Sequence, residues 1–288
     1  MYHKSPVAVV EEPEHFRLPL WKEGFCGLDL LRLKVSRVYS GRHCPKGDGS
    51  PVVVVPGYLG CDLYLVELYC WLERIGYAPY FSRIGHNAEC PDILTQRLVR
   101  TIERAHAETG MAVHLVGHSL GGVFARSAAA CVPDKVASVI TLGSPFCGVR
   151  VNPWVLRSVS LLQARLRFRG RGKDCFTTRC ACGFSCRMRD IFPEGIPQTA
   201  VYTKSDGVVD WQVCINGNRD TDFEVSGTHT GLVWNAKVYT LIADRLALAV
   251  SHQAAAAVKQ RANGEQLSRA PRVRAAALKG TGVRPAVH

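Results

Sequence analysis

Residues 112–122 read AVHLVGHSLGG and join a strand-like segment to a glycine-rich turn. The opening AVHLV is rich in aliphatic side chains of the kind found in buried strands. A run of small residues then predicts a helix over 120–132. Ser119 would therefore occupy a sharp strand-to-helix turn, where Gly117 and Gly121 remove side chains that would collide with neighbouring elements.

The segments on either side of this turn alternate between strand and helix patterns. Upstream, we predict strands over 52–55 and 78–81 and helices over 62–75 and 91–109. Downstream, we predict strands over 136–142, 198–203 and 222–226 and a closing helix over 235–250. This order predicts an α/β fold with a mostly parallel central sheet and helices on both faces.

The alternation also suggests how the chain is organised. We predict one α/β domain over 52–250, preceded by an N-terminal extension over 1–51 and followed by a basic, disordered tail over 251–288. An insertion at about 146–195 interrupts the pattern, and long insertions in such folds usually form lids or caps. Within it, residues 154–168 are expected to form an amphipathic lid helix.

Gly-x-Ser-x-Gly between a strand and a helix is the nucleophile elbow of serine hydrolases. A serine hydroxyl becomes an effective nucleophile only when a histidine takes its proton and a carboxylate orients that histidine. Asp206 directly follows a predicted strand, whereas Asp210 lies four residues further on and is the less favoured alternative. His229 is the only histidine between Asp206 and the tail. We predict Ser119, Asp206 and His229 as the catalytic residues.

An acyl-transfer reaction also needs backbone N–H groups that stabilise a developing oxyanion. The amide of Leu120 directly follows the predicted nucleophile. The loop PGYLG after the first strand supplies a second donor, for which we favour the amide of Tyr58. These two amides form the predicted oxyanion hole.

Four segments of the chain together resemble a known family. They are the PGYLG loop, the GHSLGG elbow, YTKSDGVVD at 202–210 and GTHTGL at 227–232. Over roughly residues 52–250 the chain resembles the small bacterial triacylglycerol lipases and carboxylesterases of the α/β-hydrolase superfamily. It looks still closer to uncharacterised actinobacterial-type α/β-hydrolases, which share VPG-type loops and a TLGSPF segment like that at 141–146.

The resemblance implies hydrolysis of carboxylic esters through a Ser-Asp-His triad, without a metal or cofactor. Two departures matter: Pro56 replaces the usual histidine of the oxyanion loop, and the insertion at 146–195 has no counterpart in lidless lipases. The same apparatus serves thioesterases and acyltransferases, and a non-catalytic scaffold is a further alternative.

The formal charge of +12 is concentrated in two segments. Residues 150–190 carry a net charge of +8 and residues 252–288 carry +6, which leaves −2 for the remainder. The arginines of the insertion suit a solvated face, or alternatively an anionic substrate or a peripheral contact with a lipid surface. No nucleic-acid-binding motif accompanies these arginines, so we predict no nucleic-acid partner. We expect a small-molecule acyl ester, with anionic or lipid-like character left open, as the substrate.

The N-terminal segment does not have the layout of a secretory signal, so we expect a cytoplasmic location. Twelve cysteines are many for a protein in that compartment. The sequence contains no uninterrupted apolar run of about 18 residues, so we predict no membrane-spanning helix. Four of the cysteines follow the pattern C-x4-C-x-C-x3-C: Cys175, Cys180, Cys182 and Cys186. This spacing is irregular for a structural zinc site, so we predict no metal, and free thiols or disulfides remain open.

Overall fold

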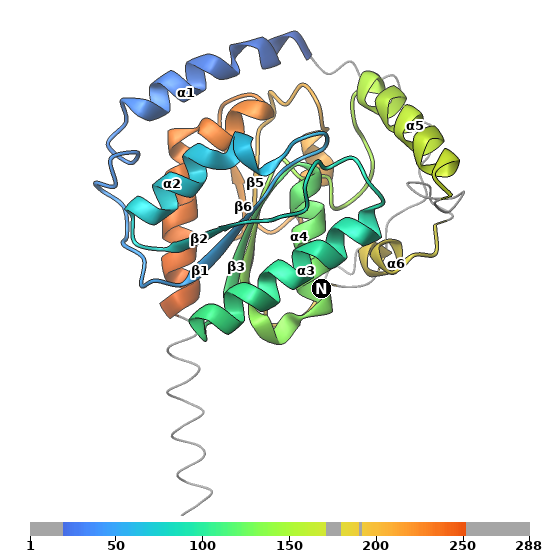
Figure 1. The fold of residues 1–288 in the computed structure, drawn as a ribbon. Helices are drawn as coiled ribbons and strands as arrows, with labels where there is room; N and C mark the ends of the chain where they lie inside the picture. The colour runs from blue at the N-terminus through green and yellow to red at the C-terminus, as the bar shows by residue number, and fades with distance from the viewer. Residues whose placement is uncertain (1–19, 171–179, 190–191, 252–288) are drawn as a thin grey trace, which may run out of the picture. The chain divides into compact units, whose positions relative to one another are not determined.

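A computed structural model describes residues 20–170, 180–189 and 192–251. Its described part is built on a six-stranded, all-parallel sheet in the order β2-β1-β3-β4-β5-β6 (Figure 1). The strands are β1 (Pro51–Val55), β2 (Ala78–Phe81), β3 (Val113–His118), β4 (Val136–Leu142), β5 (Gln198–Tyr202) and β6 (Asp222–Glu224). The predicted α/β class and parallel sheet are confirmed.

The helices follow the predicted order and add two that the sequence patterns did not indicate, α1 and α6. They are η1 (Leu20–Phe25), α1 (Cys26–Lys34), η2 (Asp62–Leu65), α2 (Val66–Arg74), α3 (Pro91–Thr109), α4 (Leu120–Cys131), η3 (Pro133–Lys135), α5 (Pro153–Phe168), α6 (Gly183–Arg189), η4 (Trp211–Cys214) and η5 (Thr230–Trp234). Residues 236–251 are also helical. The helix predicted over 62–75 begins as a 3-10 turn before it becomes regular.

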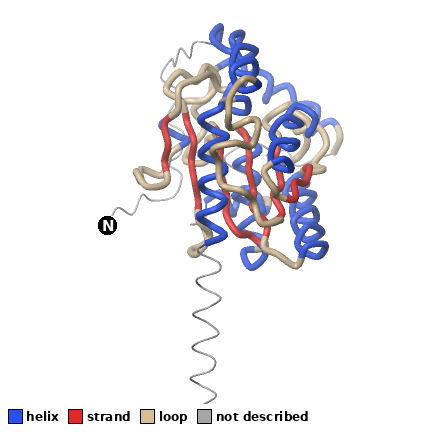
Figure 2. Tube along the Cα trace, turned by 90° about the vertical axis from the view of Figure 1, so that its left-hand side faces the viewer, coloured by secondary structure: helices blue, strands red, loops and turns tan. Residues whose placement is uncertain are grey.

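The sheet is buried on both faces because consecutive side chains of a strand point to opposite sides. Val52 and Val54 of β1 face a layer formed by α1, α2 and residues 236–251, whereas Val53 and Val55 face α3 and α4. Figure 2 shows the strands running alongside one another with helices packed against them. The all-apolar run of β1 is thereby explained.

Parallel strands place their carboxyl ends at one edge of a sheet, and the loops of interest all leave from that edge. The PGYLG loop follows β1, Ser119 follows β3, the loop with Asp206 follows β5 and the loop with His229 follows β6. The α1 helix packs against η5, directly after His229. The fold therefore gathers four sequence-distant loops at a single edge.

The interval between β4 and β5 contains α5 and α6. Helix α6 packs against α3 and α4, where Arg187 pairs with Asp92 at 3.1 Å. In Figure 1, α1 and α5 lie toward the same end of the structure, one on either side. Within the described ranges, no helix combines the length and hydropathy needed to cross a bilayer.

Candidate active site

Ser119 sits on a strained turn between β3 and α4. Its backbone has φ 52° and ψ −127°, a combination that L-residues rarely adopt. The glycines around it are needed for close backbone contact: a Cβ on Gly117 would lie 2.4 Å from Gly122 Cα, and one on Gly121 would lie 2.4 Å from Val55 O. The GHSLGG spacing is therefore a packing requirement that fixes the serine at the edge of the sheet.

Asp206 and His229 form a buried pair. The Nδ1 atom of His229 lies 2.6 Å from Asp206 Oδ2, and the two residues are only 4% and 3% exposed. The other carboxylate oxygen accepts hydrogen bonds from the amides of Val208 and Val209 at 2.8 and 2.7 Å. The carboxylate is thus oriented by the backbone and can itself hold the imidazole.

Asp210, the alternative carboxylate, faces elsewhere. It pairs with Arg150 at 3.1 Å and accepts a hydrogen bond from the amide of Gln212 at 3.1 Å. Of the two carboxylates considered from the sequence, Asp206 is therefore the one that the structure brings to His229.

The electrostatic surroundings raise the pKa of His229. Burial lowers the pKa of its imidazole, but the carboxylates of Asp206 and then Glu23 raise it, and the net change is upward from its ordinary value of 6.5. His118 behaves in the opposite way, since burial lowers its pKa to about 3. The two rings are 4.8 Å apart, and His118 is neutral at physiological pH.

Asn87 holds the oxyanion loop in the absence of the usual histidine at position 56. Its side-chain amide donates to Pro56 O at 2.8 Å. Its main-chain carbonyl oxygen accepts from the amide of Leu59 at 2.9 Å, and its main-chain N–H donates to Gly60 O at 2.9 Å. Three hydrogen bonds from one buried asparagine therefore fix both ends of the loop.

Tyr64 joins the oxyanion loop to the histidine loop through His118. Its hydroxyl accepts a hydrogen bond from the amide of Gly57 at 2.8 Å and lies 2.7 Å from His118 Nδ1. His118 Nε2 lies 3.0 Å from the carbonyl oxygen of His229, which can only accept. A neutral His118 therefore carries its proton on Nε2, and Tyr64 donates to Nδ1. This Tyr64–His118 relay connects two loops of the site.

The two predicted oxyanion amides flank the serine. Leu120 is the first residue of α4, where an N–H has no partner within the helix. The amide of Tyr58 makes no hydrogen bond to the part of the chain that the structure describes, whereas its neighbours in the loop do. A Cβ on Gly57 would come within 3.0 Å of Ser119 Cβ, which shows how closely this loop approaches the serine.

Helix α5 lies between the oxyanion loop and the loop with Asp206. Asn152, which caps its N-terminus, donates to the carbonyl oxygen of Gly207 at 3.3 Å. Further along, Leu162 and Leu166 are buried against Tyr58. A helix in this position contacts two loops of the candidate site, as a lid would.

Sequence reasoning missed three side chains that hold the site together. Asn87 and Tyr64 brace the oxyanion loop, and Glu23 of η1 contacts the loops with Asp206 and His229. No local pattern marks these residues: Asn87 and Glu23 act on segments 31 and 206 residues away, and Tyr64, although only seven residues from Gly57, belongs to no motif. Only the closeness of Tyr64 and Asn87 to the PGYLG loop in the folded chain reveals their role.

Of the four clustered cysteines, the structure describes Cys180, Cys182 and Cys186. Cys175 lies outside the described residues, and Cys182 Sγ lies 3.5 Å from Ser185 Oγ. Among residues 20–170, 180–189 and 192–251, no three His, Cys, Asp or Glu side chains are grouped to hold a metal ion.

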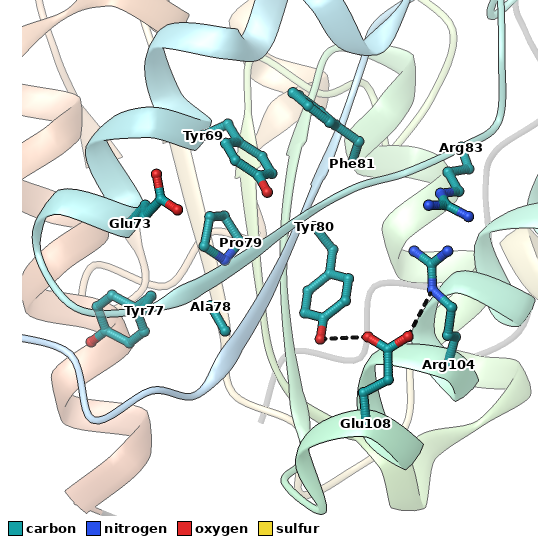
Figure 3. Close-up of a pocket in the computed structure, with 10 residues that line it drawn as sticks. All are labelled: Tyr69, Glu73, Tyr77, Ala78, Pro79, Tyr80, Phe81, Arg83, Arg104 and Glu108. Carbon is teal, nitrogen blue, oxygen red and sulfur yellow. Dashed lines mark hydrogen bonds and ion pairs between the residues drawn. The ribbon is translucent and has the colours of Figure 1, made fainter.

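A groove of about 480 Å³ runs along the edge strand β2, between α2 and α3 (Figure 3). Three of its polar side chains contact one another: Glu108 accepts from Tyr80 Oη at 2.8 Å and lies 3.7 Å from Arg104. None of the predicted site residues lines this groove. It is therefore separate from the candidate active site.

Comparisons with known proteins agree with the observed fold. The sequence profile of the Palmitoyl protein thioesterase family matches residues 51–183. Triacylglycerol lipases of Pseudarthrobacter phenanthrenivorans and Burkholderia plantarii are each 32% identical over 107 residues, which is 34% of this chain and 34% and 30% of those proteins. The matched region is thus about a third of the length of these relatives.

Two solved structures show the same fold. The lipase BlEst2 of Bacillus licheniformis has a TM-score of 0.50 at 17% identity, covering 71% of this chain and 94% of that one. A structure reported for the metagenome-derived lipolytic enzymes LipS and LipT also has a TM-score of 0.50, at 15% identity, covering 73% and 96%. The chain has the α/β-hydrolase fold. Within that class, it resembles bacterial lipases.

Proposed function

We propose that this protein is a serine hydrolase that cleaves carboxylic esters through an acyl-enzyme on Ser119. The observation that carries the proposal is the buried 2.6 Å contact between His229 and Asp206, at the same sheet edge as the strained turn of Ser119. The resemblance to triacylglycerol lipases supports an ester as the substrate.

In the proposed reaction, Ser119 Oγ attacks the ester carbonyl carbon while His229 Nε2 takes the hydroxyl proton. The carbonyl oxygen becomes an oxyanion that accepts hydrogen bonds from the amides of Tyr58 and Leu120. Collapse of this intermediate breaks the bond to the alcohol, which leaves with the proton from His229. Water then attacks the acyl-enzyme by the same steps and releases the acid. Asp206 orients the imidazole and stabilises its charged form throughout.

Exposed apolar side chains on elements that border the candidate site favour a lipid-like substrate. Trp21 and Phe25 project from η1, Leu59 and Leu63 from the oxyanion loop and η2, and Phe168 from α5, and all of them are more than half exposed. Large exposed apolar side chains that gather around a site are typical of contact with lipid or with a partner. Together we name these five residues the apolar rim.

The charge of α5 suggests what the apolar rim contacts. This helix carries arginines and no acidic residue, and the guanidinium of Arg157 stacks on Trp154 at 4.8 Å. Arginine and tryptophan side chains together suit the interface of an anionic lipid layer. The proposed function therefore includes peripheral contact with an anionic lipid surface, from which a long-chain ester would reach Ser119.

Thioester hydrolysis is a second candidate, because the Palmitoyl protein thioesterase profile covers β1, the oxyanion loop and the elbow. Oxygen esters and thioesters with the same acyl chain separate the two activities by their relative kcat/KM. Added alcohols would reveal an acyltransferase, since the acyl group would then appear in a new ester.

The deciding experiment combines labelling with turnover. A fluorophosphonate probe should label the wild-type protein and fail to label Ser119→Ala, while the control Ser40→Ala, in an exposed turn after α1, should still be labelled. Esters of graded acyl length then define the preferred chain. Labelling that persists in Ser119→Ala would refute the assignment, and a protein that neither reacts nor turns over any ester would be a non-catalytic scaffold.

A further inference from the structure

The carboxylate of Glu23 bridges the two loops that carry Asp206 and His229. Its Oε1 atom accepts hydrogen bonds from the amides of Gly207 at 3.1 Å and His229 at 2.9 Å. Its Oε2 atom accepts one from the amide of Thr230 at 2.8 Å. Glu23 comes from the N-terminal segment, roughly two hundred residues away in the sequence, so these contacts exist only in the folded protein.

These hydrogen bonds satisfy amides that the surrounding backbone leaves without acceptors. Gly207 lies in the turn after Asp206, and His229 and Thr230 begin η5, where the first N–H groups have no partner within the helix. Amides in partly buried positions rarely stay unpaired, because an unmet donor destabilises the fold. A single carboxylate therefore sets the spacing between the two loops.

We propose that Glu23 is a positioning residue, which fastens the N-terminal segment to both loops and places a second negative charge, besides that of Asp206, next to His229. This inference rests on the proposed function. Within the described residues, Glu23 accepts hydrogen bonds from backbone amides and from no side chain, so its effect on catalysis passes through His229. The packing of α1 against η5 keeps the segment in place.

The charges around His229 set the direction in which its pKa should change when Glu23 is replaced. His229 faces the carboxylates of Asp206 and Glu23 and the neutral ring of His118. Asp29 of α1 is the next carboxylate on the segment, close to Gly231. A negative charge at Glu23 raises the pKa of His229, so Glu23→Gln should lower that pKa.

The test compares Glu23→Gln, Glu23→Asp and the exposed control Glu194→Gln, which lies before β5 at the opposite edge of the sheet. Fluorophosphonate labelling of Ser119 requires a neutral His229, so its rate falls at low pH. Glu23→Gln should move this acid limb to lower pH and reduce the labelling rate by about tenfold, a change that corresponds to about 1.4 kcal/mol. Glu23→Asp keeps the charge, so it should reduce the rate without moving the limb.

Titration of the histidine rings by NMR gives a readout that does not depend on activity, with the signal of His229 assigned by its loss in His229→Asn. A lower pKa of His229 in Glu23→Gln than in wild type and Glu194→Gln supports the proposal, even if no ester is turned over. An unchanged pKa in a folded Glu23→Gln protein overturns it. Failure of the wild type to react with the probe would instead refute the proposed function.

Discussion

Replacement of Tyr64 by phenylalanine tests the relay that joins the oxyanion loop to the histidine loop. The change removes one hydroxyl group and leaves the ring in place. Two buried groups then lose their partners: the amide of Gly57, which donates to the hydroxyl at 2.8 Å, and Nδ1 of His118, which lies 2.7 Å from it.

The expected cost follows from these two contacts. A buried polar group left without a partner costs about 1–3 kcal/mol, so Tyr64→Phe should lower the free energy of unfolding by at least about 2 kcal/mol. For a domain of this size, that corresponds to a fall in Tm of about 4–8 °C. The turnover of an ester should also fall, since both connected loops surround Ser119.

Tyr239→Phe is a matched control. Tyr239 is fully buried in the core, and its hydroxyl has no hydrogen-bond partner within the described residues. The same atomic change should therefore leave stability unchanged or raise it. Urea unfolding of both variants measures the difference. A Tyr64→Phe protein within about 0.5 kcal/mol of wild type would contradict the relay.

Three further predictions follow from the site and its surroundings. Asp206→Asn should lower kcat by about 10⁴-fold and move the acid limb of kcat/KM to lower pH, because it removes the charge that raises the pKa of His229; Asp210→Asn should affect stability but not that limb. Phe25→Ser should weaken co-sedimentation with anionic vesicles, because it removes an exposed ring of the apolar rim. Gly122→Ala should lower Tm, since the added Cβ would lie 2.1 Å from Ser144 Oγ. A second substitution, Ser144→Gly, should recover part of that loss.

Local sequence patterns predicted the sheet because its elements depend on short-range rules. The apolar run of β1 and the helical spacing of α3 each lie within one segment, and the structure places both as expected. Helix α1 escaped prediction because its segment carries apolar residues on two faces. Leu33 is buried in the core, whereas Leu28 and Leu31 are exposed.

The candidate site divides in the same way. Ser119, Asp206 and His229 could be proposed from their order and from the strands that precede them. The partners that hold them could not, because Glu23 and Asn87 act on segments distant in the sequence and carry no motif of their own. Sequence also could not show that Asp210 turns toward Arg150, which depends on how the insertion folds back.

The contacts of Glu23 bear on where the folded domain begins along the chain. A chain that started at residue 52, where the sequence pattern of the domain starts, would lack an acceptor for the amides of Gly207, His229 and Thr230. It would also lack Leu33, which is fully buried in the core beside the sheet. Each unmet donor costs about 1–3 kcal/mol, and together these losses are comparable to the whole stability of a typical domain. The segment that carries Glu23 and Leu33 is therefore part of the fold in physical terms, and it connects the apolar rim to the loop that carries His229.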